Sequence, residues 1–178
     1  MELPIITLTS IKTGQLLFIT APVDSGAVFL SFTSTGNLVE CSMDDSRLQE
    51  AFTTAVKARE KAHAPYSGFK VGAALALKGT GKIYPGCNVE NASYGGTICA
   101  ERTAMVSAVA EQGTVPFEFC VVVTDTEFAT PPCALCLQVF SEFCPPDFPI
   151  YLGTVKEGIQ KKVLLKELLP IPFNAIPE

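Results

Sequence analysis

The sequence has no tryptophan, one histidine and few charged residues. The shortage of histidine limits the kinds of metal site that the chain can form, and the shortage of basic residues limits its partners. Because His63 is the only imidazole, a bound metal would have to be held mainly by thiolates. Charged residues make up 17% of the chain and the formal net charge is −5. The densest basic group, at 156–166, is interleaved with glutamates. A long nucleic acid would need a basic stripe, so this sequence disfavours it as a partner.

Long hydrophobic runs are also missing. No apolar run approaches the roughly 20 residues that span a membrane, and residues 1–4 lack the positive charge that begins a signal peptide. We therefore expect a cytoplasmic protein without membrane contact. The seven cysteines are an odd number. In a reducing compartment they are expected to be thiols or metal ligands rather than disulfides.

The 178 residues are enough for one sizeable core with an appendage. Residues 1–43 contain short β-branched or aromatic runs at 5–8, 15–20 and 27–33, separated by glycine and proline turns. This pattern predicts an N-terminal β-rich extension, and it carries no chemical motif. Residues 44–178 are predicted to form the catalytic domain.

Helical and strand patterns alternate through this second part. A helix is predicted to open at 44–46, where Ser46 and Gln49 fit a capping box, and to end by Pro65. The remaining predicted segments are strands at 69–77 and 82–88, a helix at 99–112, a strand at 117–124, a helix reaching about 143, and strands at 149–152 and 162–165. The order α-β-β-α-β-α-β, followed by the last strand, predicts an α/β fold, with a sheet between layers of helices.

Three cysteines and one glutamate carry the chemistry. Cys133 and Cys136 lie three positions apart, so two thiolates can reach one ion from the first turn of a helix, and Cys99 can supply a third from another helix. Helix N-termini favour thiolate over thiol. Three protein ligands leave the fourth position of Zn²⁺ to water, and Glu101 lies two residues after Cys99. This pattern indicates metal-assisted hydrolysis.

The segments Cys99-Ala100-Glu101 and Pro132-Cys133-Ala134-Leu135-Cys136 match the cysteine-first form of the base-deaminase signature. Further motifs follow in the same order at 64–75, 87–94, 132–139 and 167–170. Over residues 46–172 the sequence resembles the small homotetrameric cytidine deaminases, within the cytidine and deoxycytidylate deaminase family. The resemblance implies a three-layer α/β/α sandwich with a mixed five-stranded sheet.

The resemblance also implies a role for each matching residue. Zinc would be the cofactor, held by Cys99, Cys133 and Cys136, with Glu101 as the proton shuttle. Substrate would contact Phe69, Asn88, Val89, Glu90, Tyr94 and Ala100, and the supporting residues would be Arg102 and Gln138.

Within that set, the amide of Asn88 and the carboxylate of Glu90 would bind the ribose hydroxyls. Phe69 would stack on the pyrimidine, and the backbone of Ala100 would contact the edge of the base. The tyrosine would reach a neighbouring subunit's site in a homotetramer. The implied reaction is hydrolytic deamination of cytidine and deoxycytidine to uridine and deoxyuridine with release of ammonia, in pyrimidine salvage.

One position departs from the family pattern. Leu137 stands where family members usually have arginine, which removes a cation near the thiolates. This departure predicts a rate optimum at higher pH.

Several alternatives remain at this level. The cysteines could form a closed structural site with Cys87 or Cys144 as fourth ligand. Asn88 and Glu90 could cap a turn, and Phe69 could belong to the core. The protein could also deaminate another small aminated nucleoside or nucleotide, or be a zinc-bearing scaffold without turnover.

Overall fold

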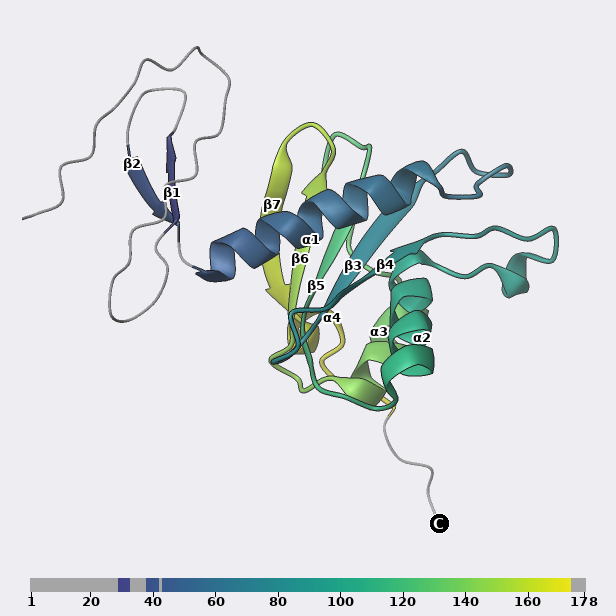
Figure 1. The fold of residues 1–178 in the computed structure, drawn as a ribbon. Coiled ribbons are helices and arrows are strands. Elements are labelled where there is room, and N and C mark those ends of the chain that lie inside the picture. Colours follow the sequence, from purple (N-terminus) through teal and green to yellow (C-terminus); the bar gives the residue numbers. More distant parts are fainter. Residues whose placement is uncertain (1–28, 33–37, 42, 174–178) are drawn as a thin grey trace, which may run out of the picture. The chain divides into compact units, whose positions relative to one another are not determined.

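The computed structural model describes residues 29–32, 38–41 and 43–173. The chain divides into two compact units, Met1–Arg47 and Leu48–Glu178 (Figure 1). In the first unit, β1 (Phe29–Phe32) and β2 (Leu38–Cys41) pair antiparallel. Strand β1 lies within the strand predicted at 27–33, whereas those predicted at 5–8 and 15–20 lie outside the described residues.

Helix α1 (Met43–Glu60) begins in the first unit and continues into the second. It starts before Ser46, so the capping box predicted at Ser46 and Gln49 does not mark its N-terminus. No glycine or proline lies between Met43 and Ser46 to interrupt a helix. The later elements are β3 (Val71–Leu77), β4 (Ile83–Cys87), the short 3₁₀-helix η1 (Tyr94–Gly96), α2 (Ala100–Gln112), β5 (Phe117–Thr124), α3 (Ala134–Phe143), β6 (Pro149–Thr154), β7 (Gly158–Leu164) and α4 (Leu165–Leu168).

These strands form one five-stranded sheet in the order β4-β3-β5-β6-β7. Strands β5 and β6 run parallel, while every other neighbouring pair in this sheet is antiparallel. The sheet is therefore mixed, and the predicted α/β sandwich with a mixed five-stranded sheet is confirmed.

Alternate residues of the central strands enter two separate cores. On β3, Leu75 joins the core that includes Met105 of α2 and Phe140 of α3, whereas Ala74 joins the core that includes Ala55 of α1. Helix α1 thus covers one face of the sheet, and α2 with α3 covers the other (Figure 1). This alternation explains the nearly continuous apolar runs, because both faces of these strands are buried.

Two glycines allow the helices to lie close to the sheet. A Cβ atom on Gly72 of β3 would lie 2.0 Å from the carbonyl oxygen of Ala55 in α1. A Cβ on Gly86 of β4 would lie 2.1 Å from the carbonyl oxygen of Ala100 in α2. No helix among the described residues is both long enough and apolar enough to cross a membrane.

Candidate metal centre and adjoining cleft

Three thiols converge at the N-termini of two helices. Cys99 is the N-cap of α2 and Cys133 the N-cap of α3, while Cys136 lies in the first turn of α3. The Sγ atom of Cys133 lies 3.6 Å from Sγ of Cys99 and 3.6 Å from Sγ of Cys136. All three sulfurs lie within 4.8 Å of one another. Tetrahedral zinc with Zn–S bonds of 2.3 Å needs sulfurs about 3.8 Å apart, so this trio fits zinc.

The surroundings of the thiols favour ionisation at Cys99. A hydrogen bond from Cys136, followed by contacts with Arg102 and Cys133, lowers the pKa of Cys99 to about 5. The Nη2 atom of Arg102 lies 3.7 Å from Cys99 Sγ and donates to the carbonyl oxygen of Thr97 at 2.9 Å. The pKa of Cys136 is raised, because Cys136 holds the proton that it donates to Cys99. Arg102 is thus a cation in contact with the thiol whose pKa is lowered.

Within the part of the chain that the structure describes, no fourth cysteine, histidine or carboxylate joins this cluster. Cys87 lines a different hollow, with Lys57 and Lys61, and Cys144 is buried in the core of α2 and α3. The two candidates for a closed four-cysteine site are therefore not part of the cluster. An open coordination position is typical of catalytic rather than structural zinc.

Glu101 is the buried acid beside the thiols. Its side chain belongs to the first turn of α2 and the residue is 4% exposed. Burial, reinforced by the charge of Cys99, raises the pKa of Glu101 to about 7. A carboxyl group that titrates near neutral pH suits proton transfer in both directions.

A cleft of about 280 Å³ opens beside this centre. Its lining comes from the loop before β3, the loop after β4, the start of α2, the end of β5 and the connection from β5 to α3. The lining residues are Ser67, Phe69, Val71, Asn88, Glu90, Thr97, Cys99, Glu101, Val122, Thr124, Thr130, Pro131 and Cys133. The cleft therefore unites Phe69, Asn88, Glu90 and Glu101 with two of the predicted zinc ligands, and it contains two carboxylates and no basic side chain.

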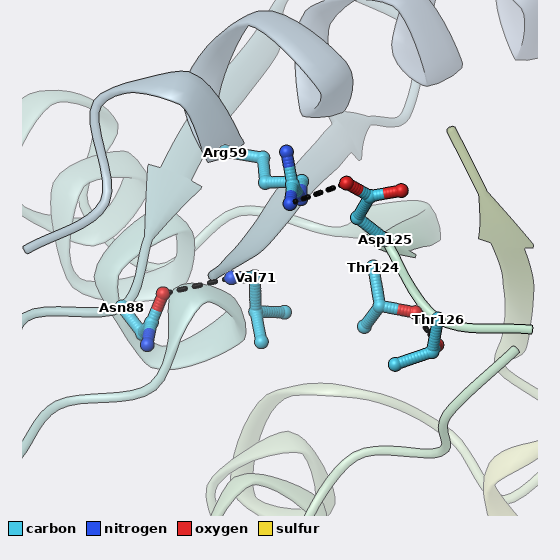
Figure 2. Close-up of polar contacts among 6 residues, drawn as sticks. All are labelled: Arg59, Val71, Asn88, Thr124, Asp125 and Thr126. Atoms are coloured by element: carbon cyan, nitrogen blue, oxygen red, sulfur yellow. Dashed lines mark hydrogen bonds and ion pairs between the residues drawn. The ribbon is translucent and has the colours of Figure 1, made fainter. Parts of the chain in front are cut away.

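Asn88 holds the segment from the predicted stacking residue, Phe69, to the first residue of β3. Its Oδ1 accepts from the backbone N–H of Val71 at 2.8 Å, and its Nδ2 donates to the carbonyl oxygen of Phe69 at 2.8 Å. Figure 2 shows the contact with Val71. One N–H and one lone pair of the amide stay available. Phe69 is 38% exposed and lines the cleft, so it is not a core residue.

Glu90 is held by the turn before β3. Its Oε2 accepts from the backbone N–H groups of Tyr66 (2.8 Å) and Ser67 (3.2 Å), and its Oε1 accepts from the Ser67 hydroxyl. The hydrogen bond from that hydroxyl lowers the pKa of Glu90 below its usual value. Both Asn88 and Glu90 thus anchor turns, as one alternative predicted, and both also face the cleft.

The other predicted site residues lie outside this cleft. Val89 pairs through its backbone with Ile98, with N···O distances of 2.9 and 3.0 Å. Tyr94 is 77% exposed and packs edge-on against Tyr66. Ala100 is fully buried. Gln138 uses its side-chain amide to hold the backbone N–H and carbonyl oxygen of Phe173.

Seven lining residues are absent from the sequence-based prediction, namely Ser67, Val71, Thr97, Val122, Thr124, Thr130 and Pro131. Thr124 ends the central strand β5 next to the parallel strand β6. Ligands of α/β proteins bind at the carboxyl ends of such strands, and this rule could have identified Thr124 and the connection that follows.

Comparisons with known proteins agree with this geometry. Residues 45–152 match the family described as the cytidine and deoxycytidylate deaminase zinc-binding region. A cytidine deaminase of Halalkalibacterium halodurans is 49% identical over 121 residues, which cover 68% of this chain and 89% of the relative. A cytidine deaminase of Sporosarcina psychrophila is 46% identical over 127 residues, which cover 71% of this chain and 91% of the relative. The crystal structure of a cytidine deaminase from Burkholderia pseudomallei is 43% identical with a TM-score of 0.66, covering 70% of this chain and 98% of that one.

Proposed function

The chain belongs to the cytidine and deoxycytidylate deaminase family, and we propose that it hydrolyses cytidine and deoxycytidine to uridine and deoxyuridine with release of ammonia. The observation that carries this function is an open trio of thiols beside a buried carboxyl group, in a cleft of small-ligand size. Cys99, Cys133 and Cys136 would hold zinc. When bound, zinc supplies a Lewis acid that makes water nucleophilic at neutral pH.

Glu101 moves the protons of the reaction. Water adds its oxygen to C4 of the cytosine ring, the bond from C4 to the exocyclic nitrogen breaks, and a carbonyl forms at C4. Glu101 takes one proton from that water for N3 of the ring, and it delivers the next to the departing amine. Because the pKa of Glu101 is about 7, the carboxyl group can accept and return a proton with little cost at each step.

The remaining polar groups position the nucleoside. Phe69 presents an exposed ring at the cleft for the pyrimidine face. The free N–H of Asn88 and a free lone pair of Glu90 provide a donor and an acceptor for the ribose hydroxyls. Leu137 is 6% exposed in the apolar core and supplies no cation to the thiolates. Arg102, whose Nη2 contacts Cys99 Sγ, supplies that positive charge instead.

An uncharged nucleoside fits this cleft better than a nucleotide does. Glu90 would repel a phosphate, and none of the lining residues carries a positive charge to offset that repulsion. Cytidine and deoxycytidine should therefore be turned over, and cytidine monophosphate should be a poor substrate.

The direct test of the function uses Glu101→Gln. This variant should keep its zinc and lose turnover by a factor of at least about 10²–10⁴, the range for removing a general acid–base group. Loss of the cytosine absorbance and release of ammonia would be measured with all three substrates. Normal turnover by the variant, or no turnover by the zinc-loaded wild-type protein, would refute the proposal.

We further propose that 44–178 is the catalytic domain and that 1–43 is an extension. The solved Burkholderia structure matches 70% of this chain but 98% of its own, which supports a catalytic unit shorter than the whole chain. The proposal also includes a cytoplasmic location, because three thiols must stay reduced to hold zinc. It includes a role in pyrimidine salvage, because the proposed reaction converts one pyrimidine nucleoside into another.

The oligomer is proposed to be a homotetramer. Large apolar side chains are unusually exposed on the second unit, among them Tyr94 (77%), Phe128 (73%), Leu135 (64%) and Val106 (55%). Burial of these side chains against neighbouring subunits would remove their apolar surface from water. Light scattering should give the mass of four chains, and a monomer would contradict this part of the proposal.

A further inference from the structure

The connection from β5 to α3, at 125–132, carries no helix or strand and yet must be placed accurately. Its last part provides Thr130 and Pro131 to the wall of the cleft, and it ends at Cys133 of the thiol trio. Backbone without a regular hydrogen-bond pattern keeps one conformation only when other groups hold it. Side chains from two elements and from the connection itself supply those contacts.

Three contacts hold residues 125–129 of the connection. Asp125 accepts from Nη2 of Arg59 on α1 at 3.2 Å. The Thr126 hydroxyl donates to the carbonyl oxygen of Phe128 at 2.7 Å. The backbone N–H of Ala129 donates to Oε1 of Gln160 on β7 at 2.8 Å. The connection is therefore held from outside by one residue of α1 and one of β7. Figure 2 shows the contact of Arg59 with Asp125.

The hydroxyl groups of Thr124 and Thr126 form a fourth contact, which is better protected from solvent than these three. Their oxygens lie 2.7 Å apart, and Figure 2 shows them pointing toward each other. Thr126 has one hydroxyl proton and gives it to Phe128, so Thr124 must be the donor between the two hydroxyls. Thr124 is 1% exposed. The Thr124 hydroxyl therefore has little access to water that could replace Thr126 as the acceptor.

The ion pair of Arg59 and Asp125 contributes less. The Asp125 side chain is 45% exposed, and such pairs are screened by water. Removal of the Thr126 hydroxyl, by contrast, would free the carbonyl oxygen of Phe128 and leave a buried donor unpaired. Both effects fall on the segment that leads to Thr130, Pro131 and Cys133.

We propose that Thr126, assisted by Gln160, is a positioning residue that holds the 128–133 segment in place, and thereby sets both the geometry of Cys133 and the wall of the cleft. This inference rests on the proposed zinc deaminase function. It adds residues of the connection and of the edge strand β7 to those that determine metal affinity and substrate binding.

The test compares Thr126→Val with Thr126→Ser in the full-length protein. Valine keeps the shape and loses both hydrogen bonds, whereas serine keeps them. The zinc dissociation constant would be measured by competition with a chromogenic chelator. It should rise about tenfold or more in the valine variant, which is the usual effect of losing a group that orients a metal ligand. The KM for cytidine should rise with it, and both should return to wild-type values in the serine variant.

Thr53→Val is the matched control, because the Thr53 hydroxyl donates to the carbonyl oxygen of Gln49 within α1, away from the connection. It should leave zinc affinity and KM unchanged. Cobalt-loaded Thr126→Val should also show altered thiolate-to-cobalt absorption, a readout that general destabilisation would not move. Wild-type affinity, KM and spectrum in Thr126→Val, or equal changes in the control, would overturn the proposal.

A second pair of variants applies where Thr126→Val does not fold. Gln160 is exposed on β7, so the fold tolerates substitution there. Gln160→Ala removes the acceptor for Ala129 and should weaken zinc binding severalfold, while Gln160→Glu keeps an oxygen acceptor and should not. Equal zinc affinity in both variants would overturn the proposal. A wild-type protein that binds no zinc or releases no ammonia would instead refute the underlying function.

Discussion

Glu101, the proposed proton shuttle, lowers the stability of the folded protein. Its carboxyl group is 4% exposed, and burial places its pKa at about 7 instead of 4.5. The folded protein therefore binds this proton more tightly than the unfolded chain does. As pH rises from 4.5 to 7, the unfolded chain releases its proton first, and folding stability falls. Above pH 7 the loss is complete.

Glu101→Gln should consequently stabilise the metal-free protein at alkaline pH and not at acidic pH. The pKa difference corresponds to about 3 kcal/mol at pH 8, at 1.36 kcal/mol per pH unit, and it should vanish near pH 4. Urea unfolding of both proteins in chelator, across this pH range, measures the difference in the free energy of unfolding. A difference that stays constant between pH 4 and pH 8 would contradict the burial of a titrating carboxyl group.

Residues with distinctive chemistry could be found from the sequence, whereas those with ordinary chemistry could not. Zinc chemistry requires thiolates at defined spacing, so Cys99, Cys133 and Cys136 were predicted together and the structure brings them together. Thr124 and Thr130 line the same cleft, but a threonine beside a strand has no pattern that separates it from a structural one. Their roles depend on long-range contacts that only the folded chain shows.

The boundaries of helices and strands could be predicted where a residue with distinctive chemistry marks them, and not elsewhere. Helix α2 was predicted nearly to the residue, because Gly113 ends it with φ +72°, a conformation that glycine adopts readily. Strand β7 was predicted at 162–165 and spans Gly158–Leu164. Its exposed residues 160–162 show no alternation of apolar side chains, and pairing with β6 makes this segment a strand.

Helix α2 must lie close to β4 for its N-terminus to present Cys99 and Glu101. Gly86→Ala would place a Cβ 2.1 Å from the carbonyl oxygen of Ala100 and should push the helix outward. Such overpacking costs about 1–3 kcal/mol. We expect lower stability and zinc binding weakened about tenfold or more, measured by thermal unfolding and chelator competition.

Gly72→Ala is the control on the opposite face of the sheet. Its Cβ would lie 2.0 Å from the carbonyl oxygen of Ala55 in α1, which supplies no metal ligand. It should destabilise the protein to a similar extent while zinc affinity stays at the wild-type value. Equal loss of zinc affinity in both variants would show that α2 is not positioned by its contact with β4.

For the whole molecule, metal and fold should be coupled. The three thiols come from two helices, and Cys99 lies 34 positions before Cys133, so the complete site exists only in the folded chain. Zinc at about 1,000 times its dissociation constant would add about 4 kcal/mol. Chelation should lower Tm by about 8–16 °C. Cys133→Ser should show no zinc-dependent change, and a Tm of the wild-type protein that is insensitive to chelator would contradict the coupling.

The two compact units should also be separable. A protein that starts at Met43, the first residue of α1, retains the whole five-stranded sheet and every residue of the cleft. It should bind zinc and deaminate cytidine with unchanged kcat/KM, as a steady-state assay would show. Loss of activity in a folded, zinc-loaded truncated protein would place part of the catalytic function in the extension.

Zinc held by Cys99 and by the cysteines of α3 would join the start of α2 to the start of α3, much as a cross-link does. An oxidant that converts any one of the three sulfurs to a sulfinic acid would remove turnover and the cross-link in a single event. Molecules damaged in this way would also unfold more readily, so cellular proteases would clear the inactive copies ahead of the intact ones.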